Sequence, residues 1–348
     1  MPVKSLSAAA VLSAMILLLF IGDSASDAVL SSMELCVTRV IPSLFPYMVL
    51  SSLMISMDLT EPLYRRLPTE KWLGLPRCAA SVLFTGLFCG FPVGAAGCAA
   101  LVRDGKLSRD DAAALCAASS AASPAFVIGT VGQWWGREYG TLLWMTQVIC
   151  ALFTGAFVFR GSGQSPVHET ASQTNTGGFP GHLAYAVSSA ASSCIAVIAS
   201  VTFFGSTARI LSHLIPWLTV PASVLLEFSQ GSAAGAKMGG MPGIIVTGAA
   251  VGFTGISVMI QSAASLAPEK ISLKPLILSK IAAMAVSAAV SAMYYLLRRP
   301  VSHRIPASAS VFTPGDGYTA LLLLGLVYLT FRLLAGSLKS RIKHTEKV

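Results

Sequence analysis

The sequence predicts an all-α polytopic membrane protein with about 8–10 membrane elements, in two internal repeats that contain broken or re-entrant helices. The composition indicates the membrane class, because 54% of the 348 residues are apolar, 11% are charged and the mean hydropathy is +0.71. Water-soluble domains of ordinary composition do not reach this balance. The long uncharged runs predict the helices, and paired interruptions in the two halves predict the repeats. The uncharged runs are residues 5–22, 40–57, 78–102, 112–135, 141–159, 183–204, 238–268, 281–297 and 317–331.

Each run approaches or exceeds the roughly 20 residues that a helix needs to cross about 30 Å of hydrocarbon. Unpaired backbone amides are costly in lipid. The runs must therefore be helical, or be non-helical only where protein or a water-filled cavity surrounds them.

Residues 1–39 are expected to form an N-terminal membrane helix and a loop. Lys4, the apolar stretch after it and the small residues at 24–26 also fit a secretory signal, so both interpretations stay open. Acidic residues dominate the loop after the first run, whereas basic residues dominate the loop after the second run and the C-terminal tail. The positive-inside tendency therefore places both termini in the cytoplasm.

The rest of the chain divides into four parts by composition. They are a first gate-like repeat (40–159), a polar linker (160–182), a second gate-like repeat (183–297), and a last part with a loop, a membrane helix and a basic tail (298–348). The linker is rich in Ser, Gly, Thr and Gln, a composition that cannot bury enough apolar surface to pack.

Interruptions of the apolar runs occur in the same order in both repeats. The pattern G-x-x-x-G-A at residues 90–95 returns at residues 231–236, and a second broken segment follows each, at 118–132 and at 248–262. In transporters built from repeats, such segments mark discontinuous helices whose ends meet the substrate. The alternative is that the small residues only let straight helices pack closely.

Glu227 is the ionisable residue that points most directly to function, because it lies in an apolar segment just before Gly231. A charge inside a membrane costs several kcal/mol unless it faces a cavity or a partner. Burial favours the protonated form of a carboxyl, so Glu227 could bind a coupling proton or cation. The alternative is a structural ion pair with Lys237 or Arg209. Lys280, at the start of a run, is expected to be an interfacial anchor.

Polar residues gather at the interruptions, where hydroxyls, amides and a carbonyl freed by proline could contact a ligand, and Lys237 could bind an anion. The alternatives are hydroxyls bonded back to the preceding helical turn and, for Lys237, a side chain that reaches the headgroups. Trp134, Trp135, Tyr139 and Trp144 are expected to form an interfacial aromatic belt. The candidate substrate-binding residues are Gly90, Pro92, Gly94, Ser119, Ser120, Ser123, Pro124, Glu227, Ser229, Gln230, Gly231, Lys237, Thr254, Ser257 and Gln261.

Five short motifs of the two repeats carry a family resemblance. They are PSLFPY (42–47), GFPVGA (90–95), SPAF (123–126), LEFSQG (226–231) and GFTGIS (252–257) leading to Gln261. With these motifs the chain resembles the YlbJ-type sporulation integral membrane protein family, in the nucleoside-recognition (gate) domain superfamily, over most of residues 40–297. The resemblance implies a polytopic membrane protein linked to the movement of dipicolinic acid during endospore formation, in the mother-cell-derived forespore membrane. Ala96 and Ala121-Ala122 depart from the lysine and asparagines that family members often carry, which bears on the substrate more than on membership.

The function expected from these features is a membrane transporter or permease for a small organic anion, with dipicolinate implied by the resemblance. The alternatives are a non-transporting scaffold component of a sporulation complex and a nucleoside-type permease. The expected partners are the anion, the lipid bilayer and either a second copy of the chain or sporulation membrane proteins, but no nucleic acid.

An enzyme is not expected. The sequence has no G-x-x-x-x-G-K-[ST] loop, and its uncharged runs hold no Ser–His pair, facing Asp pair or H-E-x-x-H. The five histidines and seven cysteines show no metal-ligand or C-x-x-C spacing, so no metal or cofactor is expected.

Overall fold

The computed structural model describes residues 21–57, 79–159 and 178–300, together with a few positions between 11 and 19. Within these ranges the chain is helical and contains no strand, which confirms the predicted all-α class. Four helical segments of the described chain are long and apolar enough to cross a membrane, consistent with a membrane-embedded protein. They are Arg137–Val158, Phe179–Leu214, Gly240–Leu266 and Lys274–Arg298.

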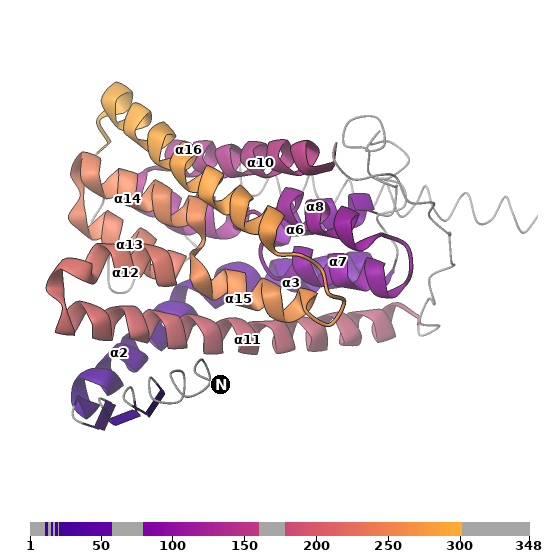
Figure 1. Cartoon of the computed structure of the whole chain (residues 1–348), viewed down its shortest axis with the longest axis horizontal. Coiled ribbons are helices and arrows are strands. Elements are labelled where there is room, and N and C mark those ends of the chain that lie inside the picture. The colour runs from indigo at the N-terminus through magenta and orange to yellow at the C-terminus, as the bar shows by residue number, and fades with distance from the viewer. Residues whose placement is uncertain are drawn as a thin grey trace, which may run out of the picture.

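The helices lie lengthwise beside one another (Figure 1). The long helix α11 (Phe179–Leu214) runs along one side of the molecule. The short helices α6 to α8 gather toward one end of the long axis and α12 to α14 toward the other (Figure 1). The two groups of short helices therefore meet in the middle of the molecule.

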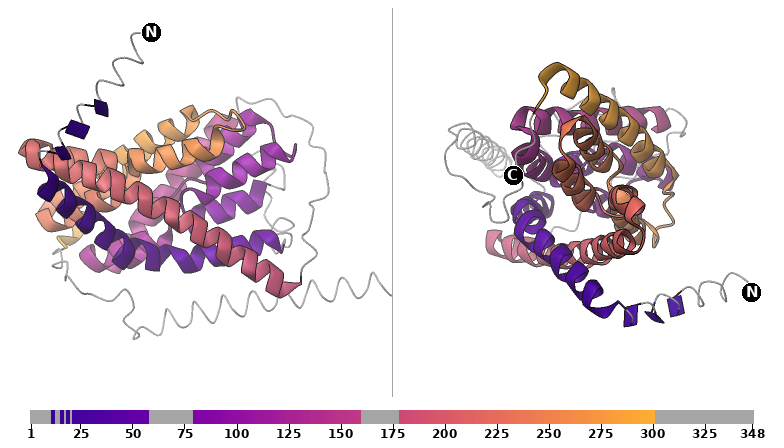
Figure 2. Two further views of the ribbon diagram at one scale, coloured as in Figure 1. Left: turned by 90° about the horizontal axis from the view of Figure 1, so that it is seen from below. Right: turned by 90° about the vertical axis from the view of Figure 1, so that its left-hand side faces the viewer.

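The described chain begins with α2 (Gly22–Leu35), the π-helical segment η1 (Cys36–Val40) and α3 (Ile41–Ser56), which follow one another without a loop. Both α2 and α3 pack against α11, as the two views of Figure 2 also show.

Two helix pairs follow in the first half. The first is α6 (Ala79–Cys89) and α7 (Val93–Arg103), joined by the three residues 90–92. The second is α8 (Arg109–Ala118) and the π-helical segment η2 (Ala125–Val131), separated by residues 119–123. Ser108 caps α8, because its hydroxyl oxygen accepts the N–H of Asp111 at 3.1 Å. The short α9 (Gly132–Trp135) and the long α10 (Arg137–Phe159) complete this half.

The second half runs from α11 through a 3-10 turn, η3 (Pro216–Leu218), and then through two further helix pairs. These are α12 (Thr219–Leu226) with α13 (Phe228–Met238), and α14 (Gly240–Phe253) with α15 (Gly255–Leu266). The long helix α16 (Lys274–Arg298) closes the described chain and packs against α14 and α10.

Three expectations about the elements are wrong. The loop expected between the first run and residue 40 is helical, because α2 and η1 together span residues 22–40. The end of the predicted linker is helical, because α11 already begins at Phe179 and carries Pro180 in its first turn, where a missing N–H costs nothing. The predicted aromatic belt is instead interior for three of its four members. Trp134, Trp135 and Tyr139 are at most 2% exposed. The rest of the linker, most of residues 1–20 and residues 301–348 lie outside the described residues.

Two of these aromatic side chains join the halves through hydrogen bonds. The indole N–H of Trp135 donates to the hydroxyl of Thr247 at 3.0 Å, and the hydroxyl of Tyr139 donates to the Ile244 carbonyl at 3.2 Å. Buried indole and phenol groups need such partners, so α9 and α10 are fixed against α14.

Glycines allow α13 and α14 to approach closely. A Cβ atom on Gly243 would lie 2.3 Å from the carbonyl oxygen of Gly235. Real Cβ atoms do not come this close to a backbone oxygen, so a side chain here would push the two helices apart.

We therefore expect Gly243→Ala to lower the free energy of unfolding by about 1–3 kcal/mol, the usual cost of overpacking. The matched change Gly22→Ala, at a helical glycine whose added Cβ would meet nothing within 4 Å, should be neutral or stabilising by up to about 1 kcal/mol. Thermal unfolding of the purified proteins in detergent measures both, and equal melting temperatures would contradict the close contact.

Candidate functional site

Four interruptions of the helices lie in the middle of the molecule. We name them break 1 (residues 90–92), break 2 (residues 119–123), break 3 (Glu227) and break 4 (Thr254). Breaks 1, 2 and 4 fall inside the segments in which the sequence predicts interruptions.

The predicted interruption at residues 231–236 is wrong, because this stretch lies within the continuous helix α13. The break occurs four residues earlier, at Glu227. Gly231 serves close packing instead, since a Cβ atom there would lie 2.9 Å from the Cβ of Ala250 and from the Cα of Val224.

Breaks 1 and 2 touch one another. Gly90 has a φ of +84°, a conformation that L side chains rarely adopt. A Cβ atom on Gly90 would lie 3.0 Å from the backbone nitrogen of Ser123. Glycine is therefore required at this position both by its own backbone conformation and by the segment that crosses it.

Breaks 3 and 4 cross in the same manner. Thr254 and Gly255 both have positive φ, of 69° and 80°. A Cβ atom on Gly255 would lie 2.9 Å from the carbonyl oxygen of Leu226 and 3.1 Å from the backbone nitrogen of Glu227. The start of α15 is thus held directly against break 3.

We call the contact of break 1 with break 2, and that of break 3 with break 4, the two crossings. A small cavity lies between them and is lined by residues of breaks 1, 2 and 3. Its volume is about 30 Å³, which is room for roughly one water molecule. An organic anion does not fit, so the site is closed in this structure. The cavity is lined by Val40, Leu44, Cys89, Gly90, Phe91, Pro92, Ser123, Phe126, Val197, Val201, Glu227, Phe228, Ser257, Val258 and Gln261.

Glu227 is the carboxyl among the residues that line this cavity, and it is fully buried. Its Oε2 accepts the backbone N–H of Gln230 at 2.9 Å and the hydroxyl of Ser229. The carboxyl thereby caps α13, where the helix dipole favours a negative charge. Its Oε1 has no hydrogen-bond partner among the described residues. One oxygen thus stabilises the helix while the other stays available to a proton, a cation or a ligand.

The ion pair weighed for Glu227 does not form within the described chain. Arg209 is half-buried and donates from Nη2 to the Gln230 side-chain carbonyl at 3.2 Å. Lys237 is exposed at the far end of α13, away from the breaks.

Lys280 lies in the interior, where the sequence does not predict it. It is 2% exposed and therefore interior, which contradicts its expected role as an interfacial anchor. Its Nζ donates to the carbonyl oxygen of Ser120 at 2.5 Å and lies 4.5 Å from the centre of the Phe91 ring. The start of the helix is the signal that indicates burial of Lys280. The apolar run starts at Ile281, whereas the helix starts at Lys274 and carries Lys280 well inside.

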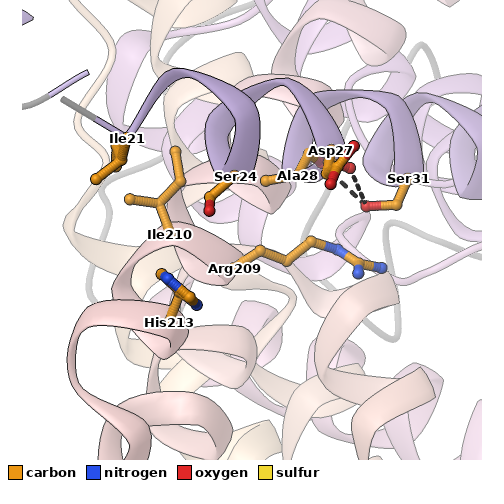
Figure 3. A pocket seen from close by; sticks show the side chains of 8 residues that line it. All are labelled: Ile21, Ser24, Asp27, Ala28, Ser31, Arg209, Ile210 and His213. Atoms are coloured by element: carbon orange, nitrogen blue, oxygen red, sulfur yellow. Dashed lines mark hydrogen bonds between the residues drawn. The ribbon is translucent and has the colours of Figure 1, made fainter. Parts of the chain in front are cut away.

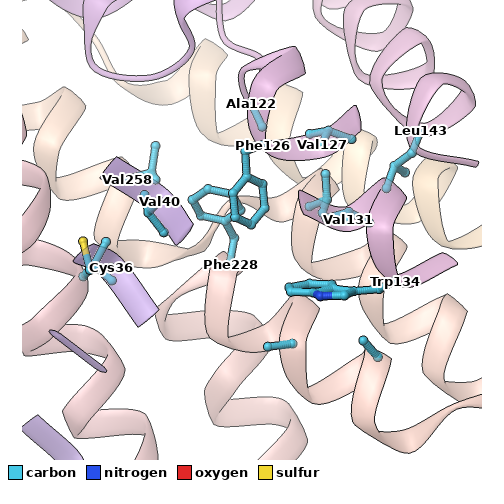
Figure 4. Close-up of a cluster of buried hydrophobic side chains, with 14 of the residues drawn as sticks. Cys36, Val40, Ala122, Phe126, Val127, Val131, Trp134, Leu143, Phe228 and Val258 are labelled. Carbon is cyan, nitrogen blue, oxygen red and sulfur yellow. The ribbon is translucent and has the colours of Figure 1, made fainter. Parts of the chain in front are cut away.

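Three phenylalanines next to the breaks form a cluster beside the cavity. The ring centres of Phe126 and Phe228 are 4.9 Å apart, and those of Phe91 and Phe228 are 6.1 Å apart, both edge to face. Figure 4 shows the first pair within the larger apolar core. The cluster fills the space between the two crossings, which accounts for the small cavity volume.

The candidate residues differ in whether they line the cavity. Of those predicted, Gly90, Pro92, Ser123, Glu227, Ser257 and Gln261 line the cavity. Gly94, Ser119, Ser120, Ser229, Gln230, Gly231 and Thr254 are buried close to the breaks without lining it, and Pro124 is half-buried. Gln230 turns its side chain toward α2 and α11, where it meets Ser32 at 3.5 Å.

A second, larger hollow of about 420 Å³ lies between α2 and α11 (Figure 3). Arg209 extends into it toward α2, and the Ser31 hydroxyl there is bonded to the Asp27 carbonyl at 2.8 Å. None of the candidate residues lines this hollow. In the described part of the chain, no group of three His, Cys, Asp or Glu side chains is arranged as metal ligands.

Comparison of the chain with protein-family models, curated proteins and solved structures gives no match. The family resemblance of the break motifs therefore stays a prediction.

We expect Gly90→Ala to lower the melting temperature more than Gly105→Ala. Both glycines have positive φ, at +84° and +69°, so both substitutions incur similar backbone strain. Only at Gly90 would the new Cβ also press on Ser123, whereas nothing lies within 4 Å at Gly105. Equal losses in thermal unfolding would show that breaks 1 and 2 do not cross as closely as described.

Proposed function

We propose that this chain is a membrane transporter for a small organic anion, which gates access to a central site at the four breaks. The observation that carries the proposal is a fully buried carboxyl with one unpaired oxygen beside a cavity where broken helices meet. Helix ends and ionisable groups placed together in this way are typical of substrate and ion sites in transporters.

The order of the elements supports an internal duplication. A long helical stretch, a broken pair, a second broken pair and another long helix occur as α2–η1–α3, α6–α7, α8–η2 and α10. The same order follows as α11, α12–α13, α14–α15 and α16. Two halves of this kind give a transporter a site at their interface and two bodies that can rock around it.

The closed cavity supports gating by movement of whole helix pairs. A site of about 30 Å³ must expand several-fold to hold a molecule such as dipicolinate. The tips of the two hairpins, α6–α7 and α12–α13, are the elements whose withdrawal would enlarge it. At the crossings the contacts are made by glycines, so no large side chain has to be withdrawn there, whereas the rings of Phe91 and Phe228 must separate.

Glu227 is proposed to carry the coupling proton or cation. Its Oε2 stays bonded to α13 in either protonation state, whereas Oε1 faces no described donor and can gain or lose a proton. The dipole of α13 offsets part of the cost of the buried charge.

On the family resemblance we propose dipicolinate as the substrate, endospore formation as the process and the forespore membrane as the location. On the charge pattern we propose that both termini lie in the cytoplasm. A nucleoside-type permease is the alternative within the same superfamily. A non-transporting scaffold is favoured by one observation, namely that glycines at the crossings make the centre well packed and nearly dry.

Uptake by vesicles that contain only this protein tests the proposal. Labelled dipicolinate and, separately, a labelled nucleoside are offered with and without an imposed proton gradient. Accumulation of either would support transport and select its substrate class. Accumulation of neither, with correctly folded protein, would contradict transport and favour the scaffold.

Glu227→Gln should reduce gradient-driven uptake by about tenfold or more, which corresponds to ~1.4 kcal/mol of lost interaction. It should also remove the response to the proton gradient, because the amide cannot exchange a proton. The matched control is Glu269→Gln, the same chemical change at a residue paired with the exposed Arg103 at 3.0 Å. Uptake that still follows the gradient in Glu227→Gln would overturn the coupling role.

A further inference from the structure

The interior holds a second ionisable side chain, which forms no ion pair with Glu227. Lys280 is buried in α16, and no carboxylate of the described residues lies within ion-pair distance of its ammonium group. An ammonium has three donors, yet its one described hydrogen bond goes to the Ser120 carbonyl, with the Phe91 ring as a further contact. A buried cation whose partners are neutral is costly, because no opposite charge offsets its lost hydration. An anion that binds next to it lowers this free-energy cost.

The carbonyl that Lys280 contacts is itself a product of break 2. In a continuous helix the Ser120 carbonyl would accept the N–H of residue 124, but Pro124 has none. Lys280 supplies the missing donor. The Lys280 side chain thus satisfies a carbonyl that Pro124 leaves without a helical donor.

One side chain stands between Lys280 and the cavity beside Glu227. Phe91 contacts the Lys280 ammonium at 4.5 Å, packs on Phe228 and also lines the cavity. It lies in break 1 between Gly90, whose N–H donates to the Gly86 carbonyl at 3.1 Å, and Pro92, whose carbonyl accepts the N–H of Ala96 at 2.9 Å. A shift of Phe91 would open the cavity toward the ammonium.

We propose that Lys280 binds the carboxylate of an aromatic acid once Phe91 moves aside. This inference rests on the transport function proposed above and names the group that selects the anion. The rings of Phe126 and Phe228, which stay in place, supply a surface for a flat apolar body. Glu227, on the cavity but not paired with Lys280, repels a second carboxylate unless it carries a proton.

Equilibrium binding to the purified full-length protein tests the subsite. The probes are labelled pyridine-2-carboxylate and its neutral amide, pyridine-2-carboxamide, which has the same shape. Wild-type protein should prefer the carboxylate by tenfold or more. Equal binding of the two probes, or no binding of the carboxylate, would overturn the proposal.

The decisive variant is Lys280→Gln, which keeps a hydrogen-bond donor for the Ser120 carbonyl but removes the charge. It should lose at least tenfold in carboxylate affinity while its amide affinity and melting temperature stay near those of wild type. Lys274→Gln, the same change at an exposed position of the same helix, should change neither. Unchanged carboxylate affinity in a folded Lys280→Gln protein would leave Lys280 with a purely structural role.

If Lys280→Gln does not fold, Lys280→Arg tests whether the positive charge at this position gives the preference for the carboxylate. It retains the charge and should retain the preference for the carboxylate over the amide. Loss of that preference in folded Lys280→Arg protein, in the presence of normal amide binding, would count against the subsite.

Uptake measured on the same preparations separates this proposal from the transport function. Binding of the carboxylate through Lys280 without any uptake would keep the subsite and overturn transport. Uptake of the carboxylate that is unchanged by Lys280→Gln, or uptake of nucleosides alone, would keep transport and overturn the subsite.

Discussion

The structure depends on how the backbone groups released by the helix breaks are satisfied inside an apolar bundle. An unpaired buried amide or carbonyl costs about 1–3 kcal/mol, so each break needs its own partners. At break 3 the Glu227 carboxyl accepts a free N–H at the start of α13. At break 2 Lys280 donates to the Ser120 carbonyl, and Gln147 accepts the N–H of Ala122 at 3.3 Å. The buried charges are thus part of the fold, and their remaining hydrogen-bonding capacity is what a ligand could use.

The glycines at the crossings set the second constraint. They let break 1 press on break 2, and break 4 on break 3, at distances that admit no side chain. Such packing closes the centre and leaves about 30 Å³ between the phenylalanine rings. Two sets of short helices that meet tip to tip, rather than interlock, can separate without unfolding. A closed centre is thus compatible both with a gate at rest and with a permanent scaffold, which is why the ligand experiments matter.

Much of this organisation could be predicted from the sequence. The membrane class followed from composition, and three of the breaks followed from Gly and Pro inside apolar runs at residues 90–92, 119–123 and 254. The break at Glu227 was displaced to Gly231, because glycine signals both an interruption and a close helix contact, and only the neighbouring helix decides between them. Lys280 was misplaced for a different reason. A lysine at the edge of an apolar run is usually an anchor, and its burial depends on where the helix starts and on the carbonyl freed by Pro124, which is distant in sequence.

The central claim is that the broken helices enclose a ligand site that contains the Glu227 carboxyl. A density map of the protein in lipid nanodiscs with saturating dipicolinate tests this most directly. We predict helices interrupted at Gly90 and Glu227, hairpin tips drawn apart, and ligand density between them and in contact with Phe228. Helices that continue through these positions, or a Glu227 side chain that faces the lipid headgroups, would contradict it.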